Sequence, residues 1–303
     1  VATAHYTIEV FLLDQIKKLS EVYSVTVVLK ATDPDFLTRR GIKADVIFAP
    51  IERKISLIND VRALFFLTKF FRDNSFDLVH SVTPKAGLLA MLAALFGDIN
   101  IRIHMFTGQV WGSQRGLMRW ILKSTDRITA LAATHVLTDS FTQRIFLINE
   151  RVISEKKSSV LASGSISGVD LERFKPDDIL RKEVREKFGI PINDLVFLYM
   201  ARLTRDKGAL VMAEAFSHFV NQGGEGHLII VGPDEEKVSH MMIALLGDSL
   251  PKVYFEDYTK SPEKFMAAAD IFCLPSYREG FGTVLINAAA VGIPATASRI
   301  YGS

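Results

Sequence analysis

The sequence predicts an α/β protein made of two doubly wound, Rossmann-like domains that face each other across a cleft. Its 303 residues are enough for two domains of ordinary size, each with a core of its own. Hydrophobic residues make up 49% of the chain and charged residues 23%, which is the composition of a folded protein. Short apolar runs alternate with amphipathic stretches of helical length, and this alternation predicts βαβ units and parallel sheets.

The first half of the chain contains five short apolar runs that we predict to be strands, at residues 25–29, 46–49, 78–81, 101–104 and 136–138. Helices are expected between them, most clearly at residues 57–72 and 85–95. The second of these helices follows Thr83 and Pro84, and a hydroxyl residue followed by proline is typical of a helix start.

The alternation stops between residues 154 and 176, where the sequence is polar and rich in Ser and Gly. We therefore predict a first domain of residues 1–167 and a second of residues 168–303. The pattern restarts in the second domain, with predicted strands at residues 195–201, 228–231, 253–255, 271–274 and 294–297. Because the sequence begins without methionine and ends soon after a strand, we expect both ends to be truncated and the second domain to be incomplete.

Composition narrows the compartment and the partners. The single cysteine, Cys273, lies in an apolar run, so we expect it to pack as a small hydrophobe in a reducing, cytoplasmic compartment. No apolar run reaches the ~20 residues that cross a bilayer, and the first residues lack the features of a secretion signal. Residues 1–170 hold 21 Lys and Arg against 16 Asp and Glu, an excess that favours an anionic partner or membrane surface and is too weak to predict a nucleic-acid partner.

Residues that directly follow the strands are the candidates for a binding site, because ligands of open α/β sheets lie beyond the carboxyl ends of the strands. After the run at 195–201, Arg202 and Lys207 stand five residues apart, just before Gly208 and a predicted helix. A guanidinium, an ammonium and the free N–H groups of a helix start all favour anions, so this segment is a candidate phosphate clamp. A solvated charged turn that opens a helix is the alternative interpretation.

A second candidate segment follows the run at 271–274. Four residues there lead into an apolar helix at 284–291: Gly280, Phe281, Gly282 and Thr283. The glycines let a ligand approach the backbone, and the helix start offers N–H donors to phosphate. Glu279 adds a carboxylate for sugar hydroxyls. The alternative is a tight turn before a helix.

Taken together, these segments resemble the retaining glycosyltransferases of family 4, which have the GT-B fold of two Rossmann-like domains. The resemblance covers nearly the whole chain and rests on four stretches, ARLTRDKG at 201–208, ADIFCLPS at 269–276, REGFGT at 278–283 and SGVDLERF at 167–174. In the first half, SVTPKAG at 81–87 and FTGQVW at 106–111 are similar to the branch that builds bacterial surface polysaccharides on lipid carriers.

The resemblance implies a role for each part of the site. Arg202 and Lys207 would hold the nucleotide pyrophosphate, Glu279 would hold the donor sugar, and residues 280–283 would bind sugar or phosphate through their backbone. The two cations would stabilise the negative charge that builds on the departing nucleoside diphosphate. The leaving phosphate itself would help to remove the acceptor proton, so we expect no metal and no cofactor besides the UDP-sugar co-substrate.

Two positions depart from the family pattern. The family usually has a second glutamate, eight positions after the first, for the ribose hydroxyls, and that position is Asn287 here. An amide still bonds to a diol but lacks the charge-assisted bond of a carboxylate. A histidine that often precedes a glycine in the first domain is replaced by Thr107, before Gly108. We interpret His104, three residues earlier, as a structural residue at a strand end.

Three further predictions complete the site. Asp257 and Tyr258, after the run at 253–255, are the candidates for contacts to the base, which the family implies to be uridine. Lys85 joins Thr107 and Gly108 on the acceptor side. Asp33-Pro-Asp35 has the form of a divalent metal site, but its place in a turn of the first domain favours turn hydrogen bonds, and no metal site is predicted.

A row of basic residues at 115–127 has two explanations. Arg115, Arg119, Lys123 and Arg127 recur every fourth residue, which places them along one face of a helix. One explanation is a basic face in solvent, opposite an apolar stripe that faces the core. The other is a surface that rests on anionic lipid. We favour the first. The stripe would be formed by Leu117, Trp120 and Ile121.

The sequence therefore predicts a retaining glycosyltransferase that moves a sugar from a UDP-sugar to a hydroxyl of a polyprenyl-diphosphate-linked glycan, in capsule, O-antigen or exopolysaccharide synthesis. It would work in the cytoplasm, with a peripheral contact to the inner face of the membrane. Two alternatives stay open. A UDP-sugar 2-epimerase shares the fold but acts without an acceptor, and a non-catalytic protein would bind a sugar nucleotide or lipid carrier without transfer.

Overall fold

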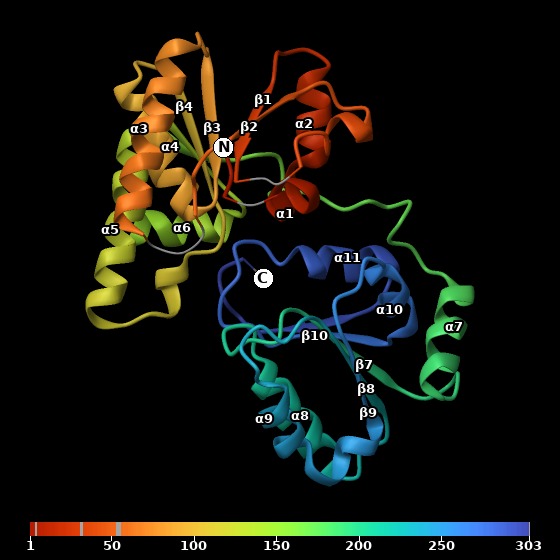
Figure 1. Ribbon diagram of the computed structural model, residues 1–303. Coiled ribbons are helices and arrows are strands. Elements are labelled where there is room, and N and C mark those ends of the chain that lie inside the picture. The colour runs from red at the N-terminus through yellow and green to blue at the C-terminus, as the bar shows by residue number, and fades with distance from the viewer. Residues whose placement is uncertain (4, 31–32, 53–55, 303) are drawn as a thin grey trace. The chain divides into compact units, whose positions relative to one another are not determined.

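Figure 1 shows the computed structural model of the chain, which describes residues 1–3, 5–30, 33–52 and 56–302. The chain forms two compact units. The first comprises Val1–Ser167 together with Gly302, and the second comprises Gly168–Tyr301. In each unit, successive residues of a strand belong to two different apolar clusters, so both faces of each sheet are covered by a core.

The first unit contains a four-stranded parallel sheet in the order β3–β4–β5–β6 and a parallel pair, β1–β2. Its strands are β1 (Thr26–Leu29), β2 (Asp45–Phe48), β3 (Leu78–Val82), β4 (Ile101–Phe106), β5 (His135–Thr138) and β6 (Ser158–Val160). The first residues of the chain join the two sets, because Ala2 N donates to Val28 O and Val82 N donates to Val1 O, both at 3.0 Å. Residues 1 and 2 therefore link β1 to β3 through backbone hydrogen bonds.

Strand β6 was not predicted, because Ser158 and Ser159 fall in the polar stretch that we interpreted as the domain boundary. The structure gives both serines side-chain partners. Arg144 Nε donates to Ser158 Oγ at 3.1 Å, and Ser159 Oγ lies 2.8 Å from His135 Nε2. Polar contacts hold this edge strand, so hydrophobicity did not reveal it.

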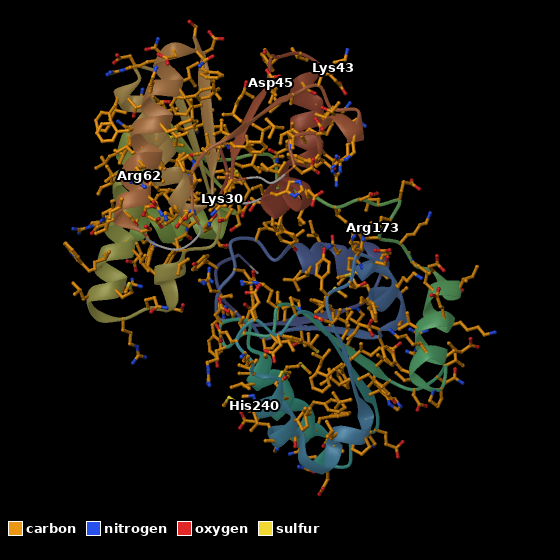
Figure 2. The ribbon with its side chains drawn as sticks, in the orientation of Figure 1. Lys30, Lys43, Asp45, Arg62, Arg173 and His240 are labelled. Atoms are coloured by element: carbon orange, nitrogen blue, oxygen red, sulfur yellow. The ribbon has the colours of Figure 1, made fainter. Side chains whose placement is uncertain are left out.

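The helices of the first unit connect its parallel strands. They are α1 (His5–Thr7), α2 (Leu13–Ser20), α3 (Leu57–Asp73), α4 (Pro84–Phe96), α5 (Gly116–Ala132) and α6 (Phe141–Asn149), with short π or 3₁₀ segments at Ile8–Leu12, Thr38–Arg40, Val110–Ser113 and Glu155–Lys157. Helix α4 carries a single charged residue, Lys85, and packs between α3 and α5. A helix that is apolar on nearly every side is a core helix. Arg62, labelled in Figure 2, is on the exposed side of α3.

Helix α5 is turned the opposite way to our prediction. Arg119 donates to Trp111 O at 3.1 Å and pairs with Glu150 at 2.9 Å, and Lys123 pairs with the same carboxylate at 2.5 Å. Both cations also lie over the Trp111 ring, so the basic face packs against the unit. The apolar stripe is at the surface instead: Leu117 is 72% exposed and Trp120 is 65% exposed.

Asp126 lies on the buried side of α5, and we expect it to make the stability of the folded chain depend on pH. It accepts a hydrogen bond from Trp111 Nε1 at 2.7 Å, but burial raises the pKa of its carboxyl to about 7. Because the folded state holds this proton more tightly than the unfolded chain does, the free energy of unfolding falls as the pH rises from about 4 to 7.

Asp126→Asn should therefore raise the melting temperature at pH 8 by a few degrees, since an amide oxygen still accepts from Trp111 without a charge. Thermal melts at pH 8 and pH 4 test this: the gain should disappear at pH 4, where the wild-type carboxyl is protonated in the folded chain. A gain of equal size at both pH values would contradict it.

The second unit contains one five-stranded parallel sheet in the order β11–β10–β7–β8–β9. Its strands are β7 (Val196–Met200), β8 (His227–Val231), β9 (Val253–Glu256), β10 (Ile271–Leu274) and β11 (Ala295–Ala297). Its helices are α7 (Asp178–Phe188), α8 (Ala209–Asn221), α9 (Ser239–Leu246), α10 (Pro262–Ala268) and α11 (Thr283–Val291), with a 3₁₀ segment at Gly247–Lys252. The strand order reverses between β7 and β10, and such a switch point is where ligands of open α/β sheets bind.

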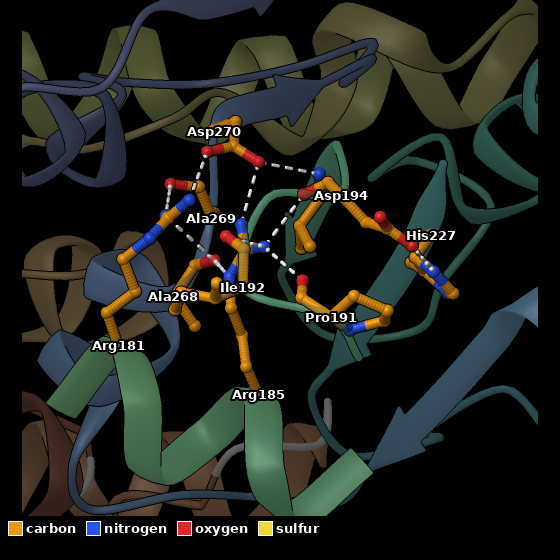
Figure 3. A network of polar contacts seen from close by, with 10 residues as sticks. Arg181, Arg185, Pro191, Ile192, Asp194, His227, Ala268, Ala269 and Asp270 are labelled. Carbon is orange, nitrogen blue, oxygen red and sulfur yellow. Dashed lines mark hydrogen bonds and ion pairs between the residues drawn. The ribbon is translucent and has the colours of Figure 1, made fainter. Parts of the chain in front are cut away.

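A buried ionic network ties α7 to the sheet of the second unit (Figure 3). Arg185 is 1% exposed, and its guanidinium donates to Asp270 Oδ2 at 2.8 Å. It also donates to four carbonyl oxygens, those of Pro191, Ile192, Asp194 and Ala268. Arg181 Nη2 donates to the other oxygen of Asp270 at 2.7 Å, and Val196 N donates to Oδ2 at 2.8 Å. Asp270, part of the ADIFCLPS stretch, therefore has a structural role.

Cys273 is buried in β10, next to the reversal of strand order. Burial raises the pKa of its thiol to about 11, so the side chain packs as a small, unreactive hydrophobe, as predicted. Separately, none of the helices in the described ranges combines the length and the apolar character needed to span a membrane.

Candidate functional site

The loops that follow β7 and β10 meet at the switch point of the second sheet. Residues 201–208 follow β7, and residues 275–282 follow β10. Gly208 has a φ of +72°, and a Cβ added there would lie 1.9 Å from Pro275 O. Only glycine allows this backbone angle together with this approach, so Gly208 sets the distance between the loops.

Hydrogen bonds fix the two loops to each other. Tyr199, fully buried in β7, donates its hydroxyl to Lys207 O at 3.1 Å. From the β10 side, Tyr277 N donates to Asp206 O at 2.9 Å and Ser276 Oγ donates to the same oxygen at 3.3 Å. The backbone around Lys207 is thus held from both sides before any ligand is considered.

Two ion pairs join the loops in register. Arg278 Nη2 donates to Asp206 Oδ2 at 2.6 Å, and Lys207 Nζ donates to both oxygens of Glu279 at 2.8 Å. The side chains of Lys207 and Glu279 are 17% and 12% exposed, so water screens this pair only partly. Burial alone would raise the pKa of Asp206, but hydrogen bonds from Thr204 and Arg278 outweigh it and lower that pKa, which keeps the carboxylate charged.

The loop after β8 contributes the partner of Arg202. Arg202 Nη1 donates to Glu235 Oε2 at 2.7 Å, and both side chains are more than one-third exposed. The β8 loop stays close because Gly232, with a φ of +145°, brings its Cα against Ala201 O, where an added Cβ would lie 1.9 Å away. An exposed pair of this kind is worth at most about 1 kcal/mol, so Arg202 can exchange Glu235 for an anionic ligand at little cost.

The glycine-rich turn leads directly into α11. Gly280 and Gly282 are buried, whereas Phe281 and Thr283 are partly exposed. Helix α11 begins at Thr283, and no side chain caps its start at Gly282. Two N–H groups of this start already have backbone partners, because Thr283 N donates to Phe281 O at 2.8 Å and Leu285 N donates to Gly282 O at 2.7 Å. A bound anion would therefore be held by the other N–H groups of the first turn. Asn287 lies one turn further along the same helix and is partly exposed.

The candidates for base contacts lie after the edge strand β9. Asp257 and Tyr258 are both exposed, and Tyr258 N donates to Asp257 Oδ1 at 2.7 Å. Strand β8 stands between β9 and β7 in the sheet. These two residues are therefore two strand positions further from the switch point than Arg202 is.

In the first unit, Thr107 and Gly108 follow β4, as the sequence predicted. The Thr107 carbonyl accepts hydrogen bonds from Gln109 Nε2 at 2.7 Å and from Gln143 Nε2 at 2.6 Å, and both glutamines are buried. Lys85 pairs with Asp60 of α3 at 2.5 Å, with both side chains largely buried. The structure thus gives Lys85 a partner that links α4 to α3, and its role on the acceptor side stays a prediction.

His104 is structural, as we interpreted it. Its ring is 1% exposed and its Nδ1 lies 2.8 Å from Ser81 Oγ, while burial lowers its pKa to about 3 and keeps it neutral. Gly87 of α4 packs on this ring, and a Cβ added to that glycine would lie 2.2 Å from it.

The Asp33-Pro-Asp35 segment forms the turn that we favoured. Asp35 N donates to Asp33 Oδ1 at 3.1 Å, and Arg39 pairs with the Asp33 carboxylate. Among the described residues, no three His, Cys, Asp or Glu side chains are grouped so that they could hold a metal ion. Independence from metal stays a prediction, because it concerns the reaction.

Sequence reasoning missed the residues that pair with the predicted cations. Asp206 and Arg278 were named only as parts of the stretches at 201–208 and 278–283, and Glu235 was not singled out. One signal was available: Asp206-Lys207 and Arg278-Glu279 are adjacent residues of opposite charge on two loops at the same sheet edge. The order is acid then base on one loop and base then acid on the other, which favours two ion pairs between the loops. The structure contains both.

The two units match two known sequence families. Residues 8–164, just over half of the chain, match the family described as Glycosyltransferase Family 4, and residues 181–303 match the one described as Glycosyl transferases group 1. HepE of Anabaena, solved in complex with UDP, has a TM-score of 0.75 at 18% identity over 99% of this chain and 80% of HepE. This likeness, with the two sheets above, shows the GT-B fold, and the two family matches show that the chain is a glycosyltransferase. The chain belongs to glycosyltransferase family 4.

Two curated relatives are similar over most of the chain. The capsular polysaccharide biosynthesis glycosyltransferase CapM of Staphylococcus aureus is 28% identical over 84% of this chain and 67% of its own length. The UDP-Gal:α-D-GlcNAc-diphosphoundecaprenol α-1,3-galactosyltransferase of Escherichia coli is 27% identical over 94% of this chain and 73% of its own length. The chain therefore spans about two thirds to three quarters of these relatives.

Proposed function

We propose that this protein is a retaining glycosyltransferase that moves a sugar from a UDP-sugar to a hydroxyl of a glycan linked to a polyprenyl diphosphate. The observation that carries the proposal is the meeting of Arg202, Lys207 and Glu279 at the switch point of the second sheet, next to the uncapped start of α11. Two cations beside one carboxylate suit a donor that combines a diphosphate with a sugar.

The proposed mechanism rests on charge. Departure of UDP concentrates negative charge on the diphosphate, and preorganised cations with helix N–H groups stabilise that charge more in the transition state than in the bound donor. Lys207 would turn from Glu279 to the diphosphate, and Arg202 would leave Glu235. Glu279 would then accept hydrogen bonds from the sugar hydroxyls, and the leaving phosphate would take the acceptor proton without a metal ion.

The substrates are proposed from the relatives. HepE was solved with UDP, and the name of the E. coli relative gives a UDP-galactose donor and a diphosphoundecaprenol-linked acceptor. The name of CapM places that enzyme in capsule synthesis. By analogy, we assign this chain to the synthesis of a bacterial surface polysaccharide, at the cytoplasmic face of the membrane where a lipid-linked acceptor would be presented.

Calorimetric titration of UDP and a panel of UDP-sugars tests the donor site, with Arg202→Ala and Glu279→Ala as variants. Arg202→Ala should abolish the binding of UDP and of UDP-sugars, whereas Glu279→Ala should weaken only the UDP-sugars, because UDP carries no donor sugar. If the wild-type chain binds neither UDP nor any UDP-sugar, the donor assignment is wrong.

Product analysis then tests the reaction class. Incubation with the UDP-sugar that binds, with and without a diphosphate-linked glycolipid acceptor, should give product only when the acceptor is present. Epimerised UDP-sugar in the absence of acceptor would instead identify a 2-epimerase. Binding without any turnover would identify a non-catalytic binding protein.

A further inference from the structure

Helices α3, α4 and α5 of the first unit present an apolar outer surface. On α3, the exposed apolar side chains are Leu57, Ile58, Val61, Phe65 and Phe66. On α5, they are Leu117, Met118, Trp120, Ile121, Ile128 and Leu131. Most of these side chains are more than half exposed, and Leu57 reaches 79%. Soluble proteins rarely leave so many large apolar side chains in water on neighbouring helices unless something else contacts them.

Helix α4 connects the two sets. It packs against α3 on one side and α5 on the other, and its own outward stripe is also apolar. Leu88 and Leu92 are partly exposed, and Leu95 and Phe96 are exposed at its end. The positions 88, 92, 95 and 96 lie on one helix face, because they are spaced three to four residues apart. We call the surface of α3, α4 and α5 formed by these side chains the apolar layer.

Positive charge accompanies the apolar layer. Arg62, Lys69 and Arg72 are exposed on α3 among its apolar side chains, and Arg115 is exposed just before α5. Within α3, α4 and α5, all of whose residues the structure describes, Asp73 is the one exposed acidic side chain, and it pairs with Lys69. Exposed Asp77 and Asp98 follow the ends of α3 and α4, so the positive border of the layer lies along α3 and before α5, at Arg62 and Arg115.

The combination of apolar side chains and positive charge indicates what the apolar layer binds. We propose that the apolar layer docks the protein on an anionic phospholipid bilayer, with the apolar side chains in the acyl boundary and the arginines at the headgroups. A second copy of this chain fits less well, because a symmetric contact would bring the arginines of two copies together. Trp120 suits the boundary of a bilayer, where an indole ring buries its apolar body and leaves its N–H in the polar region.

Docking by this layer goes beyond the proposed transfer reaction and does not depend on it. The residues that carry it lie in the first unit, whereas the donor site lies in the second. UDP titration without lipid and vesicle binding without nucleotide therefore fail independently.

The two tryptophans give a direct readout. Trp111 is 1% exposed and Trp120 is 65% exposed, and the sequence contains no others. Mixing the chain with vesicles of phosphatidylcholine and phosphatidylglycerol at 7:3 should shift the emission to shorter wavelength and protect it from acrylamide. Trp120→Phe should still sediment with the vesicles but show no shift, because Trp111 is already buried.

Variants then locate the contact. Phe65→Glu with Leu117→Glu should weaken vesicle binding at least about tenfold, since charged side chains replace apolar ones in the acyl boundary. Arg62→Gln with Arg115→Gln should weaken binding to the 7:3 vesicles several-fold and leave binding to pure phosphatidylcholine unchanged. Ile179→Glu is the matched control, because Ile179 is 80% exposed on α7 of the second unit and should leave binding unchanged. All of these side chains are exposed, and thermal melts check that the variants fold.

Several outcomes would overturn the proposal. The wild-type chain failing to bind vesicles of either composition is one, and binding that survives Phe65→Glu with Leu117→Glu is another. A self-association in sedimentation velocity that Leu117→Glu abolishes, without vesicle binding, would show that a second copy covers the layer.

Discussion

Lys207→Ala should lower kcat/KM for sugar transfer by about 10² to 10³-fold, the size expected when one preorganised donor to a developing anion is removed. The physical reason is twofold. The variant loses the ammonium that would stabilise the departing diphosphate, and it leaves the Glu279 carboxylate, 12% exposed, without its 2.8 Å partner. That carboxylate would then repel the donor. Steady-state transfer with the UDP-sugar identified by titration measures the effect.

Arg205→Ala is the matched control for Lys207→Ala. Arg205 is a cation of the same loop, but it is exposed and points to Met241 on α9. Its removal should change kcat/KM by less than about twofold, as expected for a surface substitution. Equal losses in the two variants would mean that only the overall charge of the loop matters, which would contradict the assignment of Lys207 to the diphosphate.

Arg185→Ala should lower the free energy of unfolding of the second unit by about 3 to 5 kcal/mol, because it removes a buried guanidinium that donates to one carboxylate and to four backbone carbonyls. Asp270 would keep Arg181 and Val196 N as donors but lose its 2.8 Å bond from Arg185. Each of the four carbonyls would lose one donor. The melting temperature should fall by roughly 10 °C. Denaturant unfolding followed by circular dichroism measures the free energy, and Arg185→Lys should recover only part of the loss, because an ammonium has three donors.

Lys182→Ala is the control on the same helix. Lys182 and Glu186 are about 70% exposed and 3.7 Å apart, so this pair should contribute at most about 0.5 kcal/mol. If Arg185→Ala proves no more destabilising than Lys182→Ala, the network does not hold α7 to the sheet.

The strands and helices that bury apolar side chains could be predicted from the sequence. All ten predicted strands are present, with ends that differ by at most two residues. Most of them are runs of Val, Ile and Leu in buried parallel strands, which are conspicuous in an α/β sequence, whereas β11 is the exposed Ala295–Ala297. Strand β6 was missed because serines bonded to Arg144 and His135 hold it. The predicted orientation of α5 was wrong, because the periodicity of the sequence shows two faces but not which of them is buried. Contacts of the basic face with Glu150 and Trp111 place that face inside.

The site was predictable in part, for a related reason. The position of a residue directly after a strand can be read from the sequence, so Arg202, Lys207 and Glu279 were found together at one sheet edge. Their resting partners could not be read in the same way, because a partner such as Glu235 comes from another loop whose path depends on Gly232 lying against Ala201. The roles of these residues in transfer stay predictions.

The two cross-loop pairs also bear on selectivity among small anions. Asp206 with Arg278 and Lys207 with Glu279 cancel each other's charge, so these four side chains carry no net charge before a ligand binds. A neutral group of side chains projects little field into solvent, and it offers free phosphate no unmatched cation to bind. A ligand must instead compensate Glu279 when it takes Lys207, which a sugar with its own hydroxyl donors does and inorganic phosphate does not. The site would then distinguish a sugar nucleotide from free phosphate by the exchange of ion-pair partners at Lys207 and Glu279. The total positive charge of the site would matter less.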